Sequence, residues 1–355
     1  MLFLALDIGG ANIKASSLKV DNALALRSVK LHYPLWVRGV DGLSKAIERA
    51  VALLGCDLNG LSGIALTMTA ELSDVFRNKE EGVNTILRKA KEVLEDFRVV
   101  ANDGSLLDPR EAVDRYMDVA AANWWCVGWL ASLLERDCMV VDVGSTTTTI
   151  TPVIEGRVAA KGFNDVEKMA LGEIVYVGAL RTPISSVASV VPVSGLWCRT
   201  SSEYFANVGD VNLVLGLLRE EEYDVATPDG RGKSAEECHE RLSRVVCGDG
   251  NMLRPIQTKL MARFIYEKVV ESVFEGISQV LSRLASEGPC PEVGFAAGLG
   301  DFIALDAIER AGLRGVLLKD ILGRDNSVAL TSASLALYLA HNMGVDVGRW
   351  ISSLR

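Results

Sequence analysis

Two stretches of the sequence decide the fold. The first is Leu4-Ala5-Leu6-Asp7-Ile8-Gly9-Gly10-Ala11-Asn12-Ile13-Lys14, and the second, beginning 135 residues later, is Met139-Val140-Val141-Asp142-Val143-Gly144-Ser145-Thr146-Thr147-Thr148-Thr149-Ile150. Each is an apolar run that ends in an aspartate, passes through a glycine-bearing turn and enters a second β-prone run, as a β-hairpin does. Because the same unit occurs twice, the sequence predicts two halves built on one plan.

Strand and helix patterns alternate along the rest of the chain. In the first half, the pattern predicts strand, helix, strand, helix, strand and one long helix at 24–32, 43–54, 63–67, 80–97, 98–101 and 109–134. In the second half, it predicts a strand at 157–160 and then helix, strand, helix, strand and helix at 255–285, 292–296, 301–311, 315–318 and 328–341. The fold class is therefore α/β with a duplicated βββαβαβα unit. We predict two lobes around a cleft: residues 1–136, and residues 137–355 with an insertion at about 161–250.

Composition restricts the classes of function. The chain has 355 residues, 49% of them hydrophobic, and a net charge of −9, which fits a folded protein and disfavours nucleic acid or an anionic membrane as a partner. We see no apolar run of the roughly 18 residues that a membrane span needs and no basic leader. Seven scattered cysteines and three distant histidines suggest neither a disulfide framework nor a zinc site. We expect a cytoplasmic protein with small-molecule partners, and a homo-oligomer is left open.

The repeated turns predict a site for phosphate. Glycine lets backbone N–H groups approach an anion closely, and several such groups form an anion-binding concavity. A single turn of this kind is more often only a tight β-turn, but two copies favour phosphate binding. Asp7 and Asp142, which end the two first strands, are predicted to hold Mg²⁺ against the phosphate oxygens. The predicted phosphate-binding residues of the turns are Gly9, Gly10, Asn12, Gly144, Ser145, Thr146 and Thr147.

Three other features of the sequence bear on its function. Gly298-Leu299-Gly300 follows an apolar strand, and this turn either connects strand to helix or lets a nucleotide lie against the backbone. Thr227 to Ser234 ends like a P-loop, but its first glycine is replaced and no apolar strand leads into it, so we reject a Walker site. The tryptophans at 124, 125 and 129 fit packing in the core or an interface better than a substrate-binding face.

The paired aspartate hairpins and the late Gly-x-Gly resemble the acetate and sugar kinase, Hsp70 and actin superfamily. That resemblance implies two ribonuclease H-like lobes around a phosphate-binding cleft. A further set of motifs is similar to the archaeal and methylotroph proteins of the tetrahydromethanopterin-linked one-carbon pathway, which are related to the hydantoinase and oxoprolinase group. Beyond the two hairpins, these motifs are Thr67–Phe76, Ala121–Trp124, Arg181-Thr182-Pro183 and Asp229-Gly230-Arg231.

The family member of known activity belongs to methanofuran biosynthesis, and the resemblance implies its reaction. In that reaction a transferase condenses an aminomethyl-furanmethanol diphosphate with γ-glutamyltyramine and releases pyrophosphate with Mg²⁺. Lys14 would stabilise the leaving group, and Glu71 would take the phenolic proton or merely begin a helix. Arg181 and Arg231 would bind the diphosphate or a glutamyl carboxylate. The predicted nucleotide- or substrate-binding residues are Thr69, Asn123, Gly298 and Gly300.

Two alternatives follow from the same sequence. The superfamily also contains ATP-dependent kinases, and the related group contains amidohydrolases of the hydantoinase and oxoprolinase type. In the family, the second hairpin usually continues Thr-Thr-Thr-Asp, whereas here Thr149 stands in the last position. The loss of that carboxylate suggests a changed substrate or a non-catalytic binding protein.

Overall fold

The first hairpin lies at the centre of a six-stranded sheet. The computed structural model describes residues 1–21 and 23–354. The sheet has the order β3-β2-β1-β4-β5-β6, with β1 antiparallel to β2 and parallel to β4. Its strands are β1 (Leu2–Ile8), β2 (Asn12–Val20), β3 (Leu24–His32), β4 (Gly63–Met68), β5 (Arg98–Val100) and β6 (Leu106–Leu107).

The second sheet repeats this pairing, which confirms the duplicated α/β unit and the two ribonuclease H-like lobes. Its order is β10-β8-β7-β13-β14, with β7 antiparallel to β8 and parallel to β13. The strands are β7 (Cys138–Val143), β8 (Thr148–Ile154), β10 (Ile174–Val175), β13 (Val293–Ala297) and β14 (Arg314–Leu317), and β9 (Arg157–Val158) pairs with β8. Since β10 belongs to the sheet, the excursion from the sheet begins after it and not at residue 161.

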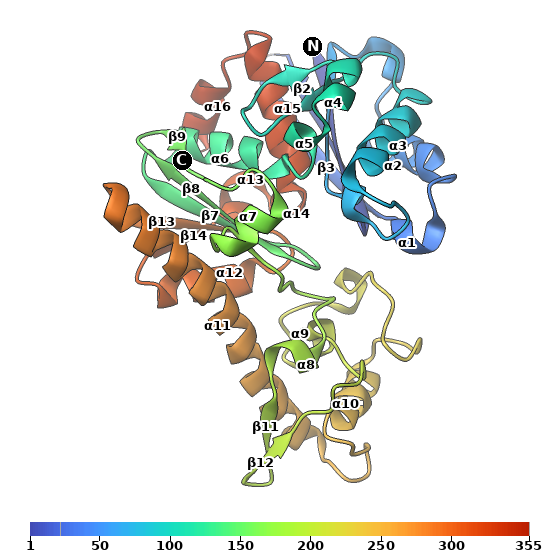
Figure 1. Ribbon diagram of the computed structural model, residues 1–355, viewed down its shortest axis with the longest axis vertical. Coiled ribbons are helices and arrows are strands. Elements are labelled where there is room, and N and C mark those ends of the chain that lie inside the picture. The colour runs from blue at the N-terminus through green and yellow to red at the C-terminus, as the bar shows by residue number, and fades with distance from the viewer. Residues whose placement is uncertain (22, 355) are drawn as a thin grey trace.

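The helices alternate with the sheets in layers. One face of the first sheet is covered by α2 (Leu43–Leu54), whose Ile47, Ala50 and Leu54 are buried at helical spacing, and by α3 (Lys79–Lys91). Its other face packs on α15 (Leu330–Asn342), which in turn packs on α6 (Asn123–Leu134) beneath the second sheet. Side chains of both sheets thus share one apolar core, and the C-terminal α15 contacts the N-terminal sheet (Figure 1).

The predicted single helix over 109–134 is wrong. The chain forms α4 (Pro109–Asp114), α5 (Tyr116–Val119) and then α6, and the Asp108 side chain caps α4. The break falls where Ala120 bridges to Met68 at the end of β4 and Ala121 adopts a positive φ of 52°. This pairing turns the backbone and brings the beginning of α6 to the edge of the sheet.

The remaining chain after β10 extends away from the sheets. Figure 1 shows this segment at the lower end of the molecule, alongside the long α11 (Pro255–Glu287). Its elements are α8 (Ile184–Val187), β11 (Val190–Val193), β12 (Leu196–Arg199), α9 (Val208–Val214) and α10 (Ala235–Arg244). A fully buried ion pair joins Arg241 to Asp210 at 2.8 Å, and such a pair holds because each charge is compensated by the other.

Short helices complete the fold. They are α1 (Leu35–Arg38), α7 (Asp165–Ala170), α12 (Asp301–Arg310), α13 (Leu318–Leu322), α14 (Arg324–Val328), α16 (Val347–Ser353) and the 3₁₀ turns η1 (Leu58–Gly60), η2 (Ala70–Leu72) and η3 (Glu220–Glu222). Across residues 1–21 and 23–354, none of the helices combines the length and the apolar character that crossing a membrane requires.

Candidate active site

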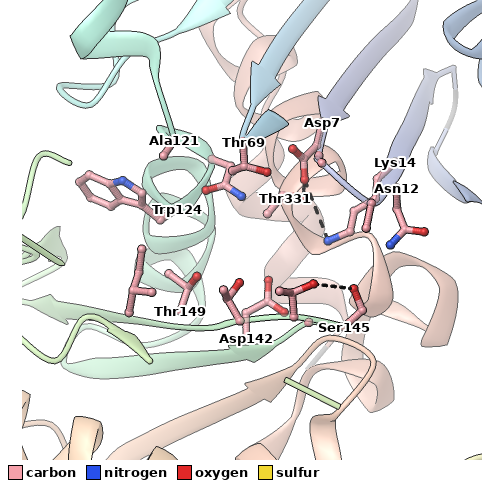
Figure 2. Close-up of a pocket in the computed structure, with 18 of the residues that line it drawn as sticks. Asp7, Asn12, Lys14, Thr69, Ala121, Trp124, Asp142, Ser145, Thr149 and Thr331 are labelled. Atoms are coloured by element: carbon pink, nitrogen blue, oxygen red, sulfur yellow. Dashed lines mark hydrogen bonds and ion pairs between the residues drawn. The ribbon is translucent and has the colours of Figure 1, made fainter. Parts of the chain in front are cut away.

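The two hairpins face one another across a cavity of about 260 Å³. Figure 2 shows Asp7 and Lys14 on one side of it and Asp142 and Ser145 on the other. The sequence-predicted residues that line it are Asp7, Gly9, Gly10, Asn12, Lys14, Thr69, Glu71, Asn123, Asp142, Gly144, Ser145, Thr146, Thr147 and Arg181. The fold therefore brings most of the predicted site together from both halves of the chain.

The two glycine turns have the same backbone geometry. The amide of Gly9 donates to the carbonyl of Asn12 at 3.0 Å, and the amide of Gly144 donates to that of Thr147 at 2.9 Å. A side chain at Gly9 would place its Cβ 2.9 Å from the Asn12 carbonyl oxygen, which is closer than packed atoms tolerate. Glycine is thus required for the tight turn itself, and the turn presents its backbone to the cavity.

Two buried carboxylates stand at the ends of the central strands. Burial raises the pKa of both Asp7 and Asp142, while the ammonium group of Lys14 opposes that rise. The Nζ of Lys14 lies 4.0 Å from Oδ2 of Asp7, and Thr331 on α15 donates a hydrogen bond to that oxygen. The Oδ1 atoms of Asp7 and Asp142 have no hydrogen-bond partner within the described part of the chain.

This donor set fits a magnesium ion. Mg²⁺ is usually held by one or two carboxylates together with waters and substrate phosphates, not by a full protein cage. Asp7 and Asp142 supply two buried oxygens that lack partners, and an unpaired buried carboxylate oxygen is costly unless a cation or donor reaches it. No cluster of three or more His, Cys, Asp or Glu ligands occurs among residues 1–21 and 23–354, so these two carboxylates are the best candidates for metal ligands.

Glu71 is a third buried acid of the cavity wall. It lies on η2 directly after β4, only 1% exposed, and burial raises its pKa to about 8. Neither carboxyl oxygen has a hydrogen-bond partner in the described structure, and the nearest cation is Lys79, 3.9 Å away. Gly82 on α3 permits this burial, because a Cβ there would be 2.4 Å from the Glu71 carbonyl oxygen.

Trp124 lies at the end of the cavity away from the charged hairpin groups (Figure 2). It is buried, as its spacing predicts, and part of its surface lines the cavity, while Trp125 and Trp129 each pack 5.0 Å from the ring of Tyr338. The ammonium group of Lys168 lies 3.5 Å from the centre of the Trp124 ring. Apolar Leu72, Met169 and Ile174 and charged Asp165 also line the cavity.

Arg181 reaches the cavity but Arg231 does not. The Nη1 of Arg181 donates to the Thr146 hydroxyl at 3.2 Å, and its guanidinium lies 4.1 Å from the centre of the Trp36 ring. Arg231 instead forms ion pairs with Asp229 at 2.8 Å and Glu240 at 2.6 Å, outside the cavity lining. The reason is the tertiary fold of the 227–232 loop, in which the buried Arg241 also binds Asp229.

The late glycine turn packs against the second hairpin. Gly298 has a φ of 86°, and a Cβ there would be 2.4 Å from Oδ1 of Asp142; the amide of Gly300 donates to the carbonyl of Val143 at 2.9 Å. Neither glycine lines the cavity, although Leu299 does. Both glycines thus have a packing role beside Asp142.

Three further residues of the cavity, Lys30, Thr149 and Thr331, carry little or no signal in the sequence. Lys30 on β3 pairs in register with Lys14, so strand alternation could have placed it on the same face. Thr331 donates a hydrogen bond to Asp7 although the two residues are 324 positions apart. A local sequence pattern cannot predict such a contact. Thr149 pairs in register with Asp142 in the second hairpin, just as Lys14 pairs with Asp7 in the first. Thr149 also lines the cavity.

The fold and the cavity together define the class: this is a two-lobed α/β protein with a cavity between two duplicated hairpins. A solved structure of acetone carboxylase without nucleotide superposes with a TM-score of 0.59 at 12% identity, over 93% of this chain and 70% of that chain, which supports the fold alone. The chain belongs to the hydantoinase/oxoprolinase family, which matches residues 62–337.

Two curated relatives refine this placement. A protein of Methanocaldococcus jannaschii is 33% identical over 341 residues, covering 96% of this chain and 98% of that protein. A protein of Methanococcus vannielii is 30% identical over 220 residues, covering 61% of this chain and 96% of that protein. Both are named (4-{4-[2-(gamma-L-glutamylamino)ethyl]phenoxymethyl}furan-2-yl)methanamine synthase. With synthases as relatives along nearly its whole length, this chain is an enzyme.

Proposed function

We propose that the protein condenses an aminomethyl-furanmethanol diphosphate with γ-glutamyltyramine to form a phenoxymethyl-furan ether, releasing pyrophosphate. The observation that carries this proposal is that one cavity is lined both by the charged and polar groups of the two hairpins and by apolar side chains that include Trp124, Met169 and Ile174. A diphosphate joined to an aromatic ring combines the same two characters. The product name of the two relatives contains the same ether, which supports this choice of substrates.

The proposed reaction breaks one carbon–oxygen bond and forms another. The furfuryl carbon–oxygen bond breaks, and its electron pair leaves with pyrophosphate. The furan ring stabilises the positive charge that develops on the carbon, and the phenolic oxygen forms the new bond while its proton passes to a base. Negative charge therefore develops at the hairpin end, where donors preorganised for it lower the barrier.

The hairpin end would bind the diphosphate. The donors would be the Ser145 hydroxyl, the Lys14 ammonium group and backbone amides of the turns other than those of Gly9 and Gly144, which bond within their own turns. Asp7 and Asp142 would hold Mg²⁺, which when bound neutralises phosphate charge and favours departure of the leaving group. In a protein of net charge −9, these local devices supply the attraction that the overall field does not.

Glu71 would accept the phenolic proton. An ordinary carboxylate is a poor base for a phenol of pKa about 10, whereas burial raises the pKa of Glu71 to about 8 and so brings it closer to that of its partner. Because the carboxyl is protonated below that value, the base form increases as pH rises toward 8. The apolar side chains that line the cavity would exclude water, which would otherwise capture the furfuryl carbon.

Thr149 places a hydroxyl beside Asp142 at the position where the family pattern has a carboxylate. The pairing of Thr149 with Asp142 places any side chain at position 149 on the same part of the second hairpin. We therefore infer that this chain works with one carboxylate fewer than the family pattern. Thr149→Asp should leave the reaction in place if the two carboxylates Asp7 and Asp142 suffice, whereas activity gained only in that variant would favour the non-catalytic reading of the natural sequence.

The decisive experiment is the reaction itself. The purified full chain is incubated with the furan diphosphate, γ-glutamyltyramine and MgCl₂, and both pyrophosphate and the ether are measured. Formation of both in equal amounts is the expected result, and Asp142→Asn is the matched variant that should lose it. Pyrophosphate without ether would indicate hydrolysis, and absence of both products would refute the proposal.

A kinase or ATP-driven amidohydrolase remains the alternative to exclude by measurement. Calorimetry should detect binding of pyrophosphate with MgCl₂ and no binding of ATP or a nonhydrolysable analogue. Tight ATP binding would favour the alternative class, because a kinase needs a place for the adenosine as well as for the phosphates.

A further inference from the structure

A second cavity, of about 490 Å³, adjoins the first. Thr146, Tyr176 and Arg181 line both, so these three residues form the wall between them. The rest of the second cavity is rich in flat, rigid side chains from both halves of the chain, chiefly His32, Pro34, Trp36, Pro183 and Tyr204. Such walls favour a ligand with an aromatic or extended apolar part.

Arg181 is the one charged side chain among the described residues that line the second cavity. Lys30, Lys233 and Arg38 act on the His32 ring on the cavity wall, but Lys30 is paired with Asp224 at 2.7 Å and Lys233 donates to the carbonyl of Tyr223. In a chain of net charge −9, a cavity whose lining carries a guanidinium and no carboxylate favours an anionic ligand group.

Arg181 is prepared to bind a carboxylate. Its guanidinium stacks on Trp36, which comes from the first half of the chain, and one N–H bonds to Thr146. Stacking holds the guanidinium plane in place while its edge still presents donors, because a guanidinium has five N–H groups. A fixed guanidinium edge matches a carboxylate with two parallel hydrogen bonds.

We propose that the second cavity binds the acceptor substrate, a phenol with a carboxylate-bearing tail, and that Arg181 binds this carboxylate. The phenolic end of the acceptor extends past Thr146 and Tyr176 into the first cavity. The tail lies in the second cavity, among its aromatic side chains. This inference rests on the proposed function, because γ-glutamyltyramine is the acceptor there. It also assigns Arg181 to the acceptor and not to the diphosphate.

The test compares two acceptors that differ only in the tail. Kinetics of the full chain are measured with γ-glutamyltyramine and with tyramine, which lacks the carboxylate. Arg181→Gln should raise KM for γ-glutamyltyramine at least about tenfold, as the loss of a charge-assisted hydrogen bond does, and should leave KM for tyramine and for the furan diphosphate unchanged. Arg181→Lys should recover part of the loss, and Arg199→Gln, an exposed arginine on β12 outside both cavities, is the matched control.

A binding measurement separates this inference from the reaction. Calorimetry with γ-glutamyltyramine, in the presence of pyrophosphate and MgCl₂, should show binding to the natural protein and at least about tenfold weaker binding to Arg181→Gln. If that is found but no ether forms, the site stands and the proposed reaction fails. If ether forms but Arg181→Gln raises only KM for the diphosphate, or if γ-glutamyltyramine does not bind, the proposed site is refuted.

Discussion

The buried carboxyl of Glu71 makes stability depend on pH in an unusual direction. Its pKa in the folded protein is about 8, against 4.5 for an ordinary glutamate. The unfolded chain therefore releases this proton at lower pH than the folded chain does. Stability from this group is fully present below pH 4.5 and is lost as pH rises toward 8, the reverse of a salt-bridged carboxylate.

Replacing Glu71 with glutamine removes this dependence. A difference of one pKa unit corresponds to about 1.4 kcal/mol, so the ionised carboxyl costs the fold at most about 4 kcal/mol more at pH 8.5 than at pH 5. Glu71→Gln, which keeps the shape of the neutral acid, should thus gain stability over the natural protein by up to that amount across this interval. The exposed Glu95→Gln is the matched control and should show no such gain.

Urea unfolding followed by circular dichroism at pH 5, 7 and 8.5 measures this effect. The free energy of unfolding of Glu71→Gln minus that of the natural protein should increase at each step. The same variant should lose ether formation, and the natural enzyme should gain rate as pH rises toward 8. A stability difference that stays constant from pH 5 to 8.5 would refute the buried, neutral state of Glu71 and with it the base assignment.

Three further predictions concern the metal site, the packing of Glu71 and the inserted segment. Asp142→Asn should abolish the Mg²⁺-dependent part of pyrophosphate binding in calorimetry while leaving the circular dichroism spectrum unchanged; undiminished binding would contradict the metal assignment. Gly82→Ala should cost about 1–3 kcal/mol in urea unfolding and reduce activity, since its Cβ would collide with the Glu71 backbone; an unchanged midpoint would show that α3 can shift freely. Arg241→Met should lower the free energy of unfolding by about 3–5 kcal/mol, because Asp210 would remain buried without its partner. If the variant were as stable as the natural protein in thermal and urea unfolding, water would have replaced the guanidinium.

Local pattern was sufficient to predict most strands and helices of the two sheet layers and the hairpin residues of the cavity. Strands and helices follow from the spacing of apolar residues, and the glycine turns follow from a backbone approach that a Cβ would block, as at Gly9. The equivalence of Asp7 and Asp142 was visible for the same reason, since each ends an apolar strand before such a turn. The pairing of the two sheets confirms this duplication.

Long-range packing accounts for the features that local pattern did not predict. The helix over 109–134 breaks because Ala120 pairs with Met68, a contact that helix propensity cannot report. Arg231 leaves the site because its loop folds around Asp229, and Trp124 enters it because α6 begins at the end of β4. In each case a partner distant in sequence determines where the side chain lies.

By itself the sequence determined a duplicated α/β protein of net charge −9 with two carboxylate hairpins directed to a common cleft. The tertiary structure decided what the cleft can do: it buried Glu71 and raised its pKa, brought Thr331 to Asp7, and placed Arg181 on Trp36 between two cavities. The physical reason is the distance along the chain over which each kind of interaction acts. Periodicity and turn sterics act between neighbours in the chain, whereas burial, charge and cavity shape arise only when residues hundreds of positions apart are packed together.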